Sequence, residues 1–279
     1  MNEPQVSIIT ICYNAAELLP LTIESVLAQD YSDYEYIIED GDSTDDTASV
    51  VKSYAKAFAE KGIEFKYICK KDGGIYDAMN KGVESSCGRW INFMNAGDCF
   101  YSERVLSSVF DGREYEKGVI YGDCVEYEYG RFYRFRKCMD SIEERMPFSH
   151  QSAFASAELL REYPFETSYR YSADYDFLLT VYQGGYKFDD SGEVICITTK
   201  DGVSSVNYHD TLIESADILK AHGLYHHTED EIRKLERELS IKQFVLDHFP
   251  TFVKKAIRGR QIKARGQQMD VTVPAWYKV

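Results

Sequence analysis

The first hundred residues alternate short apolar runs with helical patterns, and this alternation limits the fold more than any other feature of the sequence. Residues 6–12, VSIITIC, contain almost no polar break, as expected of a strand buried on both faces of a parallel sheet. A helical spacing of apolar residues follows directly, and the same order is repeated with strands expected at 34–38, 63–69 and 90–94. Successive βα units of this kind predict a doubly wound, mainly parallel α/β sheet with right-handed crossovers.

The second half of the chain has a different pattern. Residues 119–136 alternate aromatic with polar side chains on either side of Gly130, which predicts a small antiparallel hairpin on the surface of the sheet. A helix is expected from about Asp174 to Gln183, and a strand follows at 193–199. We therefore expect the second half of the chain to add a few strands to the sheet, some of them antiparallel.

The strands cease near Ser205, which predicts a main domain at 1–205 and a helical extension at 206–279. From Lys254 onwards the extension carries a net charge of +6, although the whole chain carries −14. In 250–266, basic residues alternate with bulky apolar ones, a pattern typical of a helix lying on an anionic membrane surface. The same pattern is also typical of a surface helix packed against an acidic body, so both interpretations stay open.

Composition and charge exclude several classes of protein. With 44% hydrophobic and 28% charged residues, the composition is that of a globular protein, and the net charge of −14 argues against a partner that is a nucleic acid. No stretch approaches the roughly 18 apolar residues of a membrane span, and a secretory signal pattern is missing. The seven cysteines are scattered and never form C-x-x-C, which favours reduced thiols. We therefore expect a cytoplasmic protein, located at the inner face of the cell membrane if its basic tail binds lipid.

Acidic and amide side chains follow the expected strands at the edge where parallel strands end. Asp40 follows the second strand and Asp72 the third. Asn95 and Asp98 follow the fourth, and Asp174 opens a later helix. Each carboxylate can serve as a helix cap, worth about 0.5 to 2 kcal/mol. Because parallel strand ends lie side by side, however, all of them are expected to converge on one crevice and to bind a divalent cation.

Such a crevice suits transfer of a group from a phosphate-activated donor. Mg²⁺ or Mn²⁺ prefers oxygen ligands, uses one or two carboxylates, and completes its shell with a diphosphate. A separate carboxylate near the acceptor hydroxyl would act as general base while the cation stabilises the departing diphosphate.

Five motifs then occur in a characteristic order: VSIITICYN, EDGDSTDDT, DGGIYDAMNKG, NAGD and SADYD. This set, spread over residues 5–205, resembles the family 2 glycosyltransferases, and DGGIYDAMNKG is close to a run common in bacterial polysaccharide-building members. The resemblance implies a GT-A fold and an inverting mechanism. It also implies a nucleotide-diphosphate sugar donor, most simply a UDP-sugar, and a hydroxyl of a glycan or lipid-linked acceptor in surface polysaccharide synthesis.

The resemblance assigns roles to individual residues. Tyr13 would lie against the nucleobase, Asp40 would be the nucleotide-binding aspartate, and Asp72 would help to hold the base. Asp98 matches the metal ligand beneath the diphosphate, and Asp174 matches the carboxylate that activates the acceptor. Six further residues are expected to contact the donor or acceptor: Asp77, Asn80, Asn95, His150, Gln151 and Asp176, the last also being a second candidate for the base.

Some positions depart from the family pattern and leave other functions open. Gly97 stands where many members have an acid, and Asp42 and Met79 also differ from the usual residues. A nucleotidyltransferase would need a glycine-rich phosphate loop with a lysine, which CYNAAELL is not. A phosphatase would need a nucleophilic Asp40 with lysine support. A non-catalytic module that binds sugar nucleotides or glycans would follow if Gly97 has removed the metal site.

Overall fold

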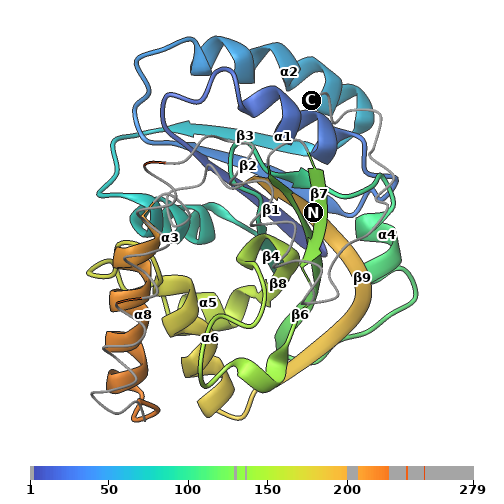
Figure 1. Cartoon of the computed structure of the whole chain (residues 1–279). Helices are drawn as coiled ribbons and strands as arrows, with labels where there is room; N and C mark the ends of the chain where they lie inside the picture. The colour runs from blue at the N-terminus through green and yellow to red at the C-terminus, as the bar shows by residue number, and fades with distance from the viewer. Residues whose placement is uncertain are drawn as a thin grey trace.

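The computed structural model describes residues 3–128, 131–135, 137–199 and 207–225, together with the single positions 237 and 248. One curled sheet runs through this part of the chain and carries helices on both faces (Figure 1). The strands are β1 (Val6–Cys12), β2 (Tyr34–Asp40), β3 (Glu64–Cys69), β4 (Trp90–Phe93), β5 (Cys99–Phe100), β6 (Gly118–Glu128), β7 (Arg131–Phe135), β8 (Ala153–Ser156) and β9 (Lys187–Thr199). The helices are α1 (Leu19–Leu27), α2 (Thr47–Lys61), α3 (Ile75–Ser85), α4 (Val105–Phe110), α5 (Ala157–Glu162), α6 (Ala173–Gln183) and α8 (Tyr208–Ala221), with the short 3-10 turns η1 (Met139–Ser141) and η2 (His150–Ser152).

The amino-terminal half forms the parallel part of the sheet that the sequence predicts. Its strands lie in the order β3-β2-β1-β4, and β1 pairs with a parallel neighbour on each side. The register aligns Cys12 with Asp40 and Ile9 with Phe93, so the loops after these strands leave at one edge of the sheet. All residues of β1 and β2 are buried, as expected of strands covered on both faces.

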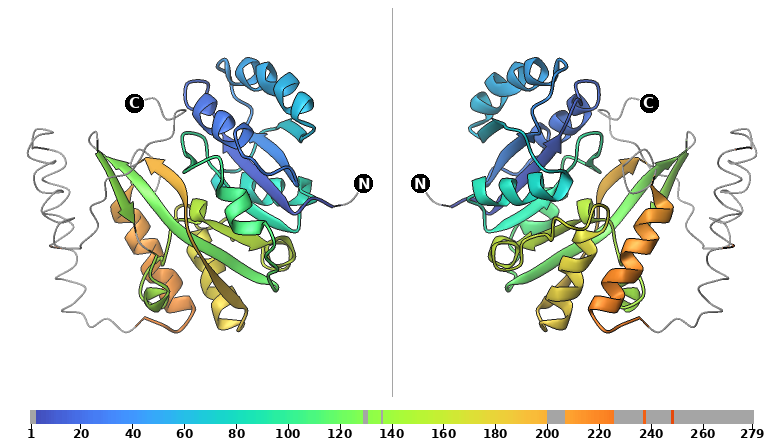
Figure 2. Two further views of the ribbon diagram at one scale, coloured as in Figure 1. Left: turned by 90° about the vertical axis from the view of Figure 1, so that its right-hand side faces the viewer. Right: turned by 90° about the vertical axis from the view of Figure 1, so that its left-hand side faces the viewer.

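Two hydrophobic clusters fill the space between the sheet and its helices. One cluster contains residues of α1, α2 and α4, and the other contains residues of α3, α5, α6 and α8. The two groups of helices lie on opposite sides of the sheet in all views (Figure 1, Figure 2). The arrangement confirms the predicted fold class, a mainly parallel α/β sheet with some antiparallel strands.

The predicted hairpin is only partly correct. β6 and β7 pair antiparallel as expected, but β6 is an internal strand between β8 and β9, and its first eight residues are buried. Two glycines make this possible, because a Cβ on Gly118 would lie 2.2 Å from the Lys187 carbonyl oxygen and one on Gly122 2.6 Å from that of Glu193. Strand β9 consequently begins at Lys187 and not at the predicted position 193.

Helix α8 is the described part of the predicted extension, and the expected boundary near Ser205 and the basic segment 250–266 lie outside the described residues. Within the described ranges, no helix is both long enough and apolar enough to span a membrane.

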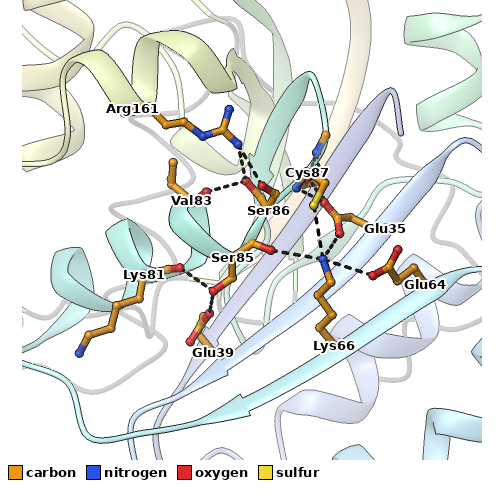
Figure 3. Close-up of polar contacts among 12 residues, drawn as sticks. Glu35, Glu39, Glu64, Lys66, Lys81, Val83, Ser85, Ser86, Cys87 and Arg161 are labelled. Atoms are coloured by element: carbon orange, nitrogen blue, oxygen red, sulfur yellow. Dashed lines mark hydrogen bonds and ion pairs between the residues drawn. The ribbon is translucent and has the colours of Figure 1, made fainter. Parts of the chain in front are cut away.

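A buried carboxylate ties the other edge of the parallel strands together (Figure 3). Glu35 on β2 is fully buried, and its Oε1 accepts hydrogen bonds from Ser7 Oγ at 2.6 Å and from the Cys87 N–H at 2.5 Å. Lys66 Nζ lies 2.7 Å from Glu35 Oε2. Burial by itself raises the pKa of this carboxyl, but the hydrogen bonds from Lys66, Ser7 and Cys87 outweigh it and hold the pKa below its ordinary value.

We expect Glu35→Gln to lower the free energy of unfolding by about 2 kcal/mol at pH 7, because Lys66 loses its buried counter-charge and keeps only the more exposed Glu64, at 3.3 Å. The pKa of Glu35 is lower in the folded protein than its ordinary value of 4.5, so its stabilisation is complete above pH 4.5 and is lost as the pH falls through the folded pKa. The difference in the free energy of unfolding between wild type and variant, measured by urea denaturation, should therefore become smaller at acidic pH. Glu60→Gln is the control, since Glu60 is 68% exposed and should change stability by less than about 0.5 kcal/mol.

Candidate active site

Asp98, in the loop after β4, is a buried carboxylate with two donors from distant parts of the chain. Its side chain is 8% exposed, and its Oδ2 accepts a hydrogen bond from Gln151 Nε2 at 2.7 Å. The backbone N–H of Thr199, at the end of β9, lies 3.3 Å from Oδ1. Burial raises the pKa of Asp98 to about 6, although the hydrogen bonds and the nearby His150 ring act in the opposite direction. A cation beside this carboxylate would offset the cost of its burial.

Asp174 lies in the first turn of α6 and is held from two directions. His150 Nδ1 lies 2.9 Å from Asp174 Oδ2, and the Tyr76 hydroxyl donates to Oδ1 at 3.0 Å. The other ring nitrogen of His150 lies 3.1 Å from Asn95 Nδ2. Because His150 and Gln151 are neighbours in η2, this one turn connects Asp174 with Asp98. The predicted metal ligand and the predicted base thus belong to one polar network.

Tyr76 is the member of this network that the sequence analysis missed. It is buried on α3, and burial together with the Asp174 carboxylate raises its pKa well above the ordinary value, which keeps the hydroxyl protonated as a donor. The sequence feature that could have pointed to Tyr76 is its position within the motif DGGIYDAMNKG. The motif alone does not tell which neighbour the ring reaches, because Asp174 is 98 residues away.

Tyr13, Asp72 and Gly41 meet at the ends of the neighbouring strands. Tyr13 follows β1 and is 63% exposed, as a platform for a planar ligand must be. A Cβ on Gly41 would lie 2.5 Å from Asp72 Oδ2 and 3.5 Å from the Tyr13 ring, so a larger residue there would displace the Asp72 carboxylate. Two of the three residues expected at the nucleobase are therefore brought together.

Asp40, the third of these residues, is used by the protein itself. It is 1% exposed, and its Oδ1 accepts hydrogen bonds from the hydroxyl and the N–H of Ser43, at 2.6 and 2.9 Å. Its Oδ2 accepts one from the Tyr67 hydroxyl at 2.5 Å. Asp40 thus shapes the loop that carries Gly41, and Asp42 in that loop has a left-handed φ of 72°, a conformation that aspartate tolerates better than most side chains.

Two predicted contacts on α3 also have partners of their own. Asp77 Oδ2 accepts hydrogen bonds from Lys81 at 2.6 Å and from the Gly73 N–H at 2.7 Å, and the Lys81 bond holds the pKa of Asp77 below its usual range. The amide of Asn80 bonds in both directions to the backbone of Phe165, at 2.9 Å each. In this structure these side chains stabilise loops and do not join the network of Asp98 and Asp174.

The geometry also separates the two candidates for the base. Asp176 Oδ1 lies 2.8 Å from His222 Nε2, just beyond the end of α8, whereas Asp174 faces His150 and Tyr76. Residues two apart on a helix point to different sides, so only one of them can face the site.

The predicted acids fall into two groups of contacts, and their convergence on a single crevice stays a prediction. They form one group around Asp98 and Asp174 and another around Asp40 and Asp72, and no three His, Cys, Asp or Glu side chains of the described ranges are placed to hold a metal ion. Asn95 Oδ1 is nevertheless buried without a hydrogen-bond partner in this part of the protein. This oxygen and the Asp98 carboxylate are ligands that Mg²⁺ and Mn²⁺ prefer, so the chemistry of the two side chains fits a cation.

Comparison with known proteins identifies the class. The sequence model described as Glycosyl transferase family 2 matches residues 7–178, more than half of the chain, so the chain belongs to this family. A Mycobacterium bovis protein named PGL/p-HBAD biosynthesis glycosyltransferase is 31% identical over 184 residues, which cover 63% of this chain and 69% of that protein. The protein is therefore a glycosyltransferase.

Solved structures of low sequence identity share the fold. TarS of S. aureus, in complex with UDP-GlcNAc, matches with a TM-score of 0.62 and 17% identity over 81% of this chain and 68% of its own. The mannosyltransferase PcManGT from Pyrobaculum calidifontis, in complex with GDP-Man and Mn²⁺, matches with a TM-score of 0.60 and 22% identity over 79% of this chain and 63% of its own. Both likenesses confirm the GT-A architecture.

The backbone explains the unusual Gly97. Its φ is +96°, a conformation that side chains rarely adopt, and a Cβ there would contact Leu18 at 3.7 Å. An acid at this position therefore requires a different loop.

We expect Gly97→Asp to lower the free energy of unfolding by about 1 to 3 kcal/mol in urea denaturation, because of the strained φ. Gly112→Asp is the matched control. Gly112 has a φ of +65° in an open turn, and aspartate adopts this φ at small cost. The free energy of unfolding should therefore fall by less than about 1 kcal/mol in this variant. Equal losses in the two variants would contradict the explanation.

Proposed function

We propose that this glycosyltransferase is inverting and metal-dependent, and that it moves a hexose-type sugar from a nucleoside diphosphate, most simply UDP, to a hydroxyl of a glycan or lipid-linked acceptor in surface polysaccharide synthesis. The observation that carries the proposal is the hydrogen-bonded chain from Asp98 through η2 to Asp174. It joins a buried oxygen site for a cation to a separate, oriented carboxylate. The donors in the two related structures, UDP-GlcNAc and GDP-Man, support a nucleotide-sugar substrate.

Asp174 acts as the general base in this proposal. The acceptor oxygen attacks the anomeric carbon while the bond from that carbon to the diphosphate breaks, and Asp174 takes the acceptor proton. The configuration at the anomeric carbon inverts, and no covalent intermediate is needed. His150 and Tyr76 each hold one carboxylate oxygen, which fixes the direction of the remaining lone pairs.

Asp98 and Asn95 would hold the cation, which would offset negative charge on the departing diphosphate. The Mn²⁺ in the PcManGT structure supports this choice of metal. Gln151 keeps the Asp98 carboxylate in place, at 2.7 Å. The bound nucleotide would place its base against Tyr13 and Asp72, with Asp40 supporting the loop beneath.

Asp77, Asn80 and Asp176 act indirectly in this proposal, through the loops and helices that they hold. The lipid-linked acceptor and membrane contact through 250–266 stay predictions, since that segment lies outside the described residues.

Asp174→Asn should reduce sugar transfer by about 100-fold or more, because an amide cannot take the acceptor proton. Donor binding should stay within about twofold of wild type, since this proposal places the carboxylate at the acceptor and not at the nucleotide. Sugar transfer is measured as the release of nucleoside diphosphate from a panel of UDP- and GDP-sugars with simple alkyl glycoside acceptors. Donor binding is measured by calorimetry.

Asp176→Asn is the matched control, because it makes the same change two residues further along α6. Its amide oxygen can still accept the hydrogen bond from His222, so transfer should stay within about threefold of wild type. Near-normal transfer by Asp174→Asn, or a larger loss in Asp176→Asn, would assign the base elsewhere. Donor binding without transfer by the wild type under every condition would favour a non-catalytic binding module.

Asp98→Ala should abolish the part of the UDP-induced thermal stabilisation that depends on Mn²⁺. In the wild type the whole stabilisation by UDP with Mn²⁺ amounts to about 2.7 kcal/mol at a ligand concentration of about 100 times Kd, and the Mn²⁺-dependent part is its excess over the value without Mn²⁺. Asp30→Ala serves as control, since Asp30 is 43% exposed and pairs only loosely with Arg104, at 4.0 Å. An unchanged cation response in Asp98→Ala would place the metal on other residues.

A further inference from the structure

Helix α8 holds the segment that leads into α6. Both oxygens of the Glu214 carboxylate accept backbone hydrogen bonds from this segment, Oε1 from the Arg170 N–H and Oε2 from the Tyr171 N–H, each at 2.6 Å. Hydrogen bonds from backbone N–H groups to a carboxylate are among the strong ones. One side chain therefore fixes two successive peptide groups just before the helix that carries Asp174.

The start of α6 is held by a second contact with α8. Ser172, the residue that precedes α6, is 3% exposed, and its Oγ lies 3.2 Å from Ser215 Oγ and 3.3 Å from the Thr211 carbonyl oxygen. Asp174 is only two residues further on. Contacts with α8 thus hold the backbone at the start of the helix from which the Asp174 side chain leaves.

The far end of α6 is tied to the end of α8 as well. His222 bridges Asp176 and Gln183, with its Nε2 2.8 Å from Asp176 Oδ1 and its Nδ1 2.8 Å from Gln183 Oε1. Ile218 and Leu219 of α8 are buried in the same hydrophobic cluster as α6. The two helices lie side by side in Figure 1 and Figure 2 and contact each other.

We propose that Glu214 is a positioning residue for the transfer reaction, through which helix α8 of the carboxy-terminal extension holds Asp174 at the acceptor. The inference rests on the proposed role of Asp174 as base. Glu214 itself touches neither donor nor acceptor. Glu214 acts through the peptide groups of residues 170 and 171 and the first turn of α6. His150 and Tyr76 contact the Asp174 carboxylate itself.

The prediction is a loss of turnover without a loss of donor binding. Displacement of a catalytic group by about 1 Å can cost about 100-fold in rate, so we expect Glu214→Ala to lower kcat for transfer by about tenfold or more. The dissociation constant of the UDP-sugar should stay within about twofold, because Tyr13 and Asp72 lie on other elements. Full-length variants are compared by kcat, by calorimetry of donor binding and by thermal unfolding.

Two further variants make the test specific. Asp217→Ala removes a carboxylate from the same helix, but one that is 59% exposed and pairs with Lys220, so its kcat should equal that of wild type. Glu214→Gln keeps the size of the side chain and one acceptor oxygen, and it replaces the alanine variant if that variant does not fold. Intermediate turnover in Glu214→Gln supports positioning.

The outcomes separate this inference from the proposed function. Wild-type kcat in a folded Glu214 variant, together with loss of transfer in Asp174→Asn, overturns the role of Glu214 alone. Normal transfer by Asp174→Asn overturns the proposed base, whatever Glu214 does. An equal fall of kcat in Asp217→Ala and Glu214→Ala shows a general effect of α8 and also overturns the inference.

Discussion

Strand β1 pairs with a parallel neighbour on each side, and the rest of the molecule depends on this register. With Cys12 beside Asp40 and Ile9 beside Phe93, the chain leaves three strands at one edge of the sheet. The loops that carry Tyr13, Gly41 and Asp98 therefore start next to each other. A slip of one residue would turn the buried side chains of β1 to the opposite faces, so the apolar packing on both sides of the strand enforces the register.

The sheet alone does not complete the site, because its acids need partners from the second half of the chain. The turn η2 supplies them: Gln151 faces Asp98, and the adjacent His150 faces Asp174. Two neighbouring residues thus set the distance between the proposed cation site and the proposed base. Both carboxylates are largely buried, which makes their electrostatic interactions with η2 stronger than in water.

Helix α8, which belongs to the predicted carboxy-terminal extension, is part of this arrangement. Helix α8 contacts α6 at both ends and adds Ile218 and Leu219 to the hydrophobic cluster that contains α6. Glu214 and His222 connect α8 to the segment before α6 and to α6 itself, the helix that carries the proposed base.

The sequence by itself determined the βα order of the first hundred residues and the placement of acids after the strands, because burial on both faces and parallel pairing leave strong local patterns. It also carried the family motifs. It misplaced β6 at the surface, since its alternation of aromatic and polar residues does not show that Gly118 and Gly122 let β9 approach.

Only the tertiary structure decided which acids meet. Asp174 contacts Tyr76, 98 positions away in the sequence, and His150, 24 positions away. Asp176 instead contacts His222, and Asp40 accepts a hydrogen bond from Ser43 in its own loop. Sequence spacing could not decide this, because it fixes where a residue lies along its own helix or strand, while the direction of its side chain is chosen by neighbours that folding brings from elsewhere.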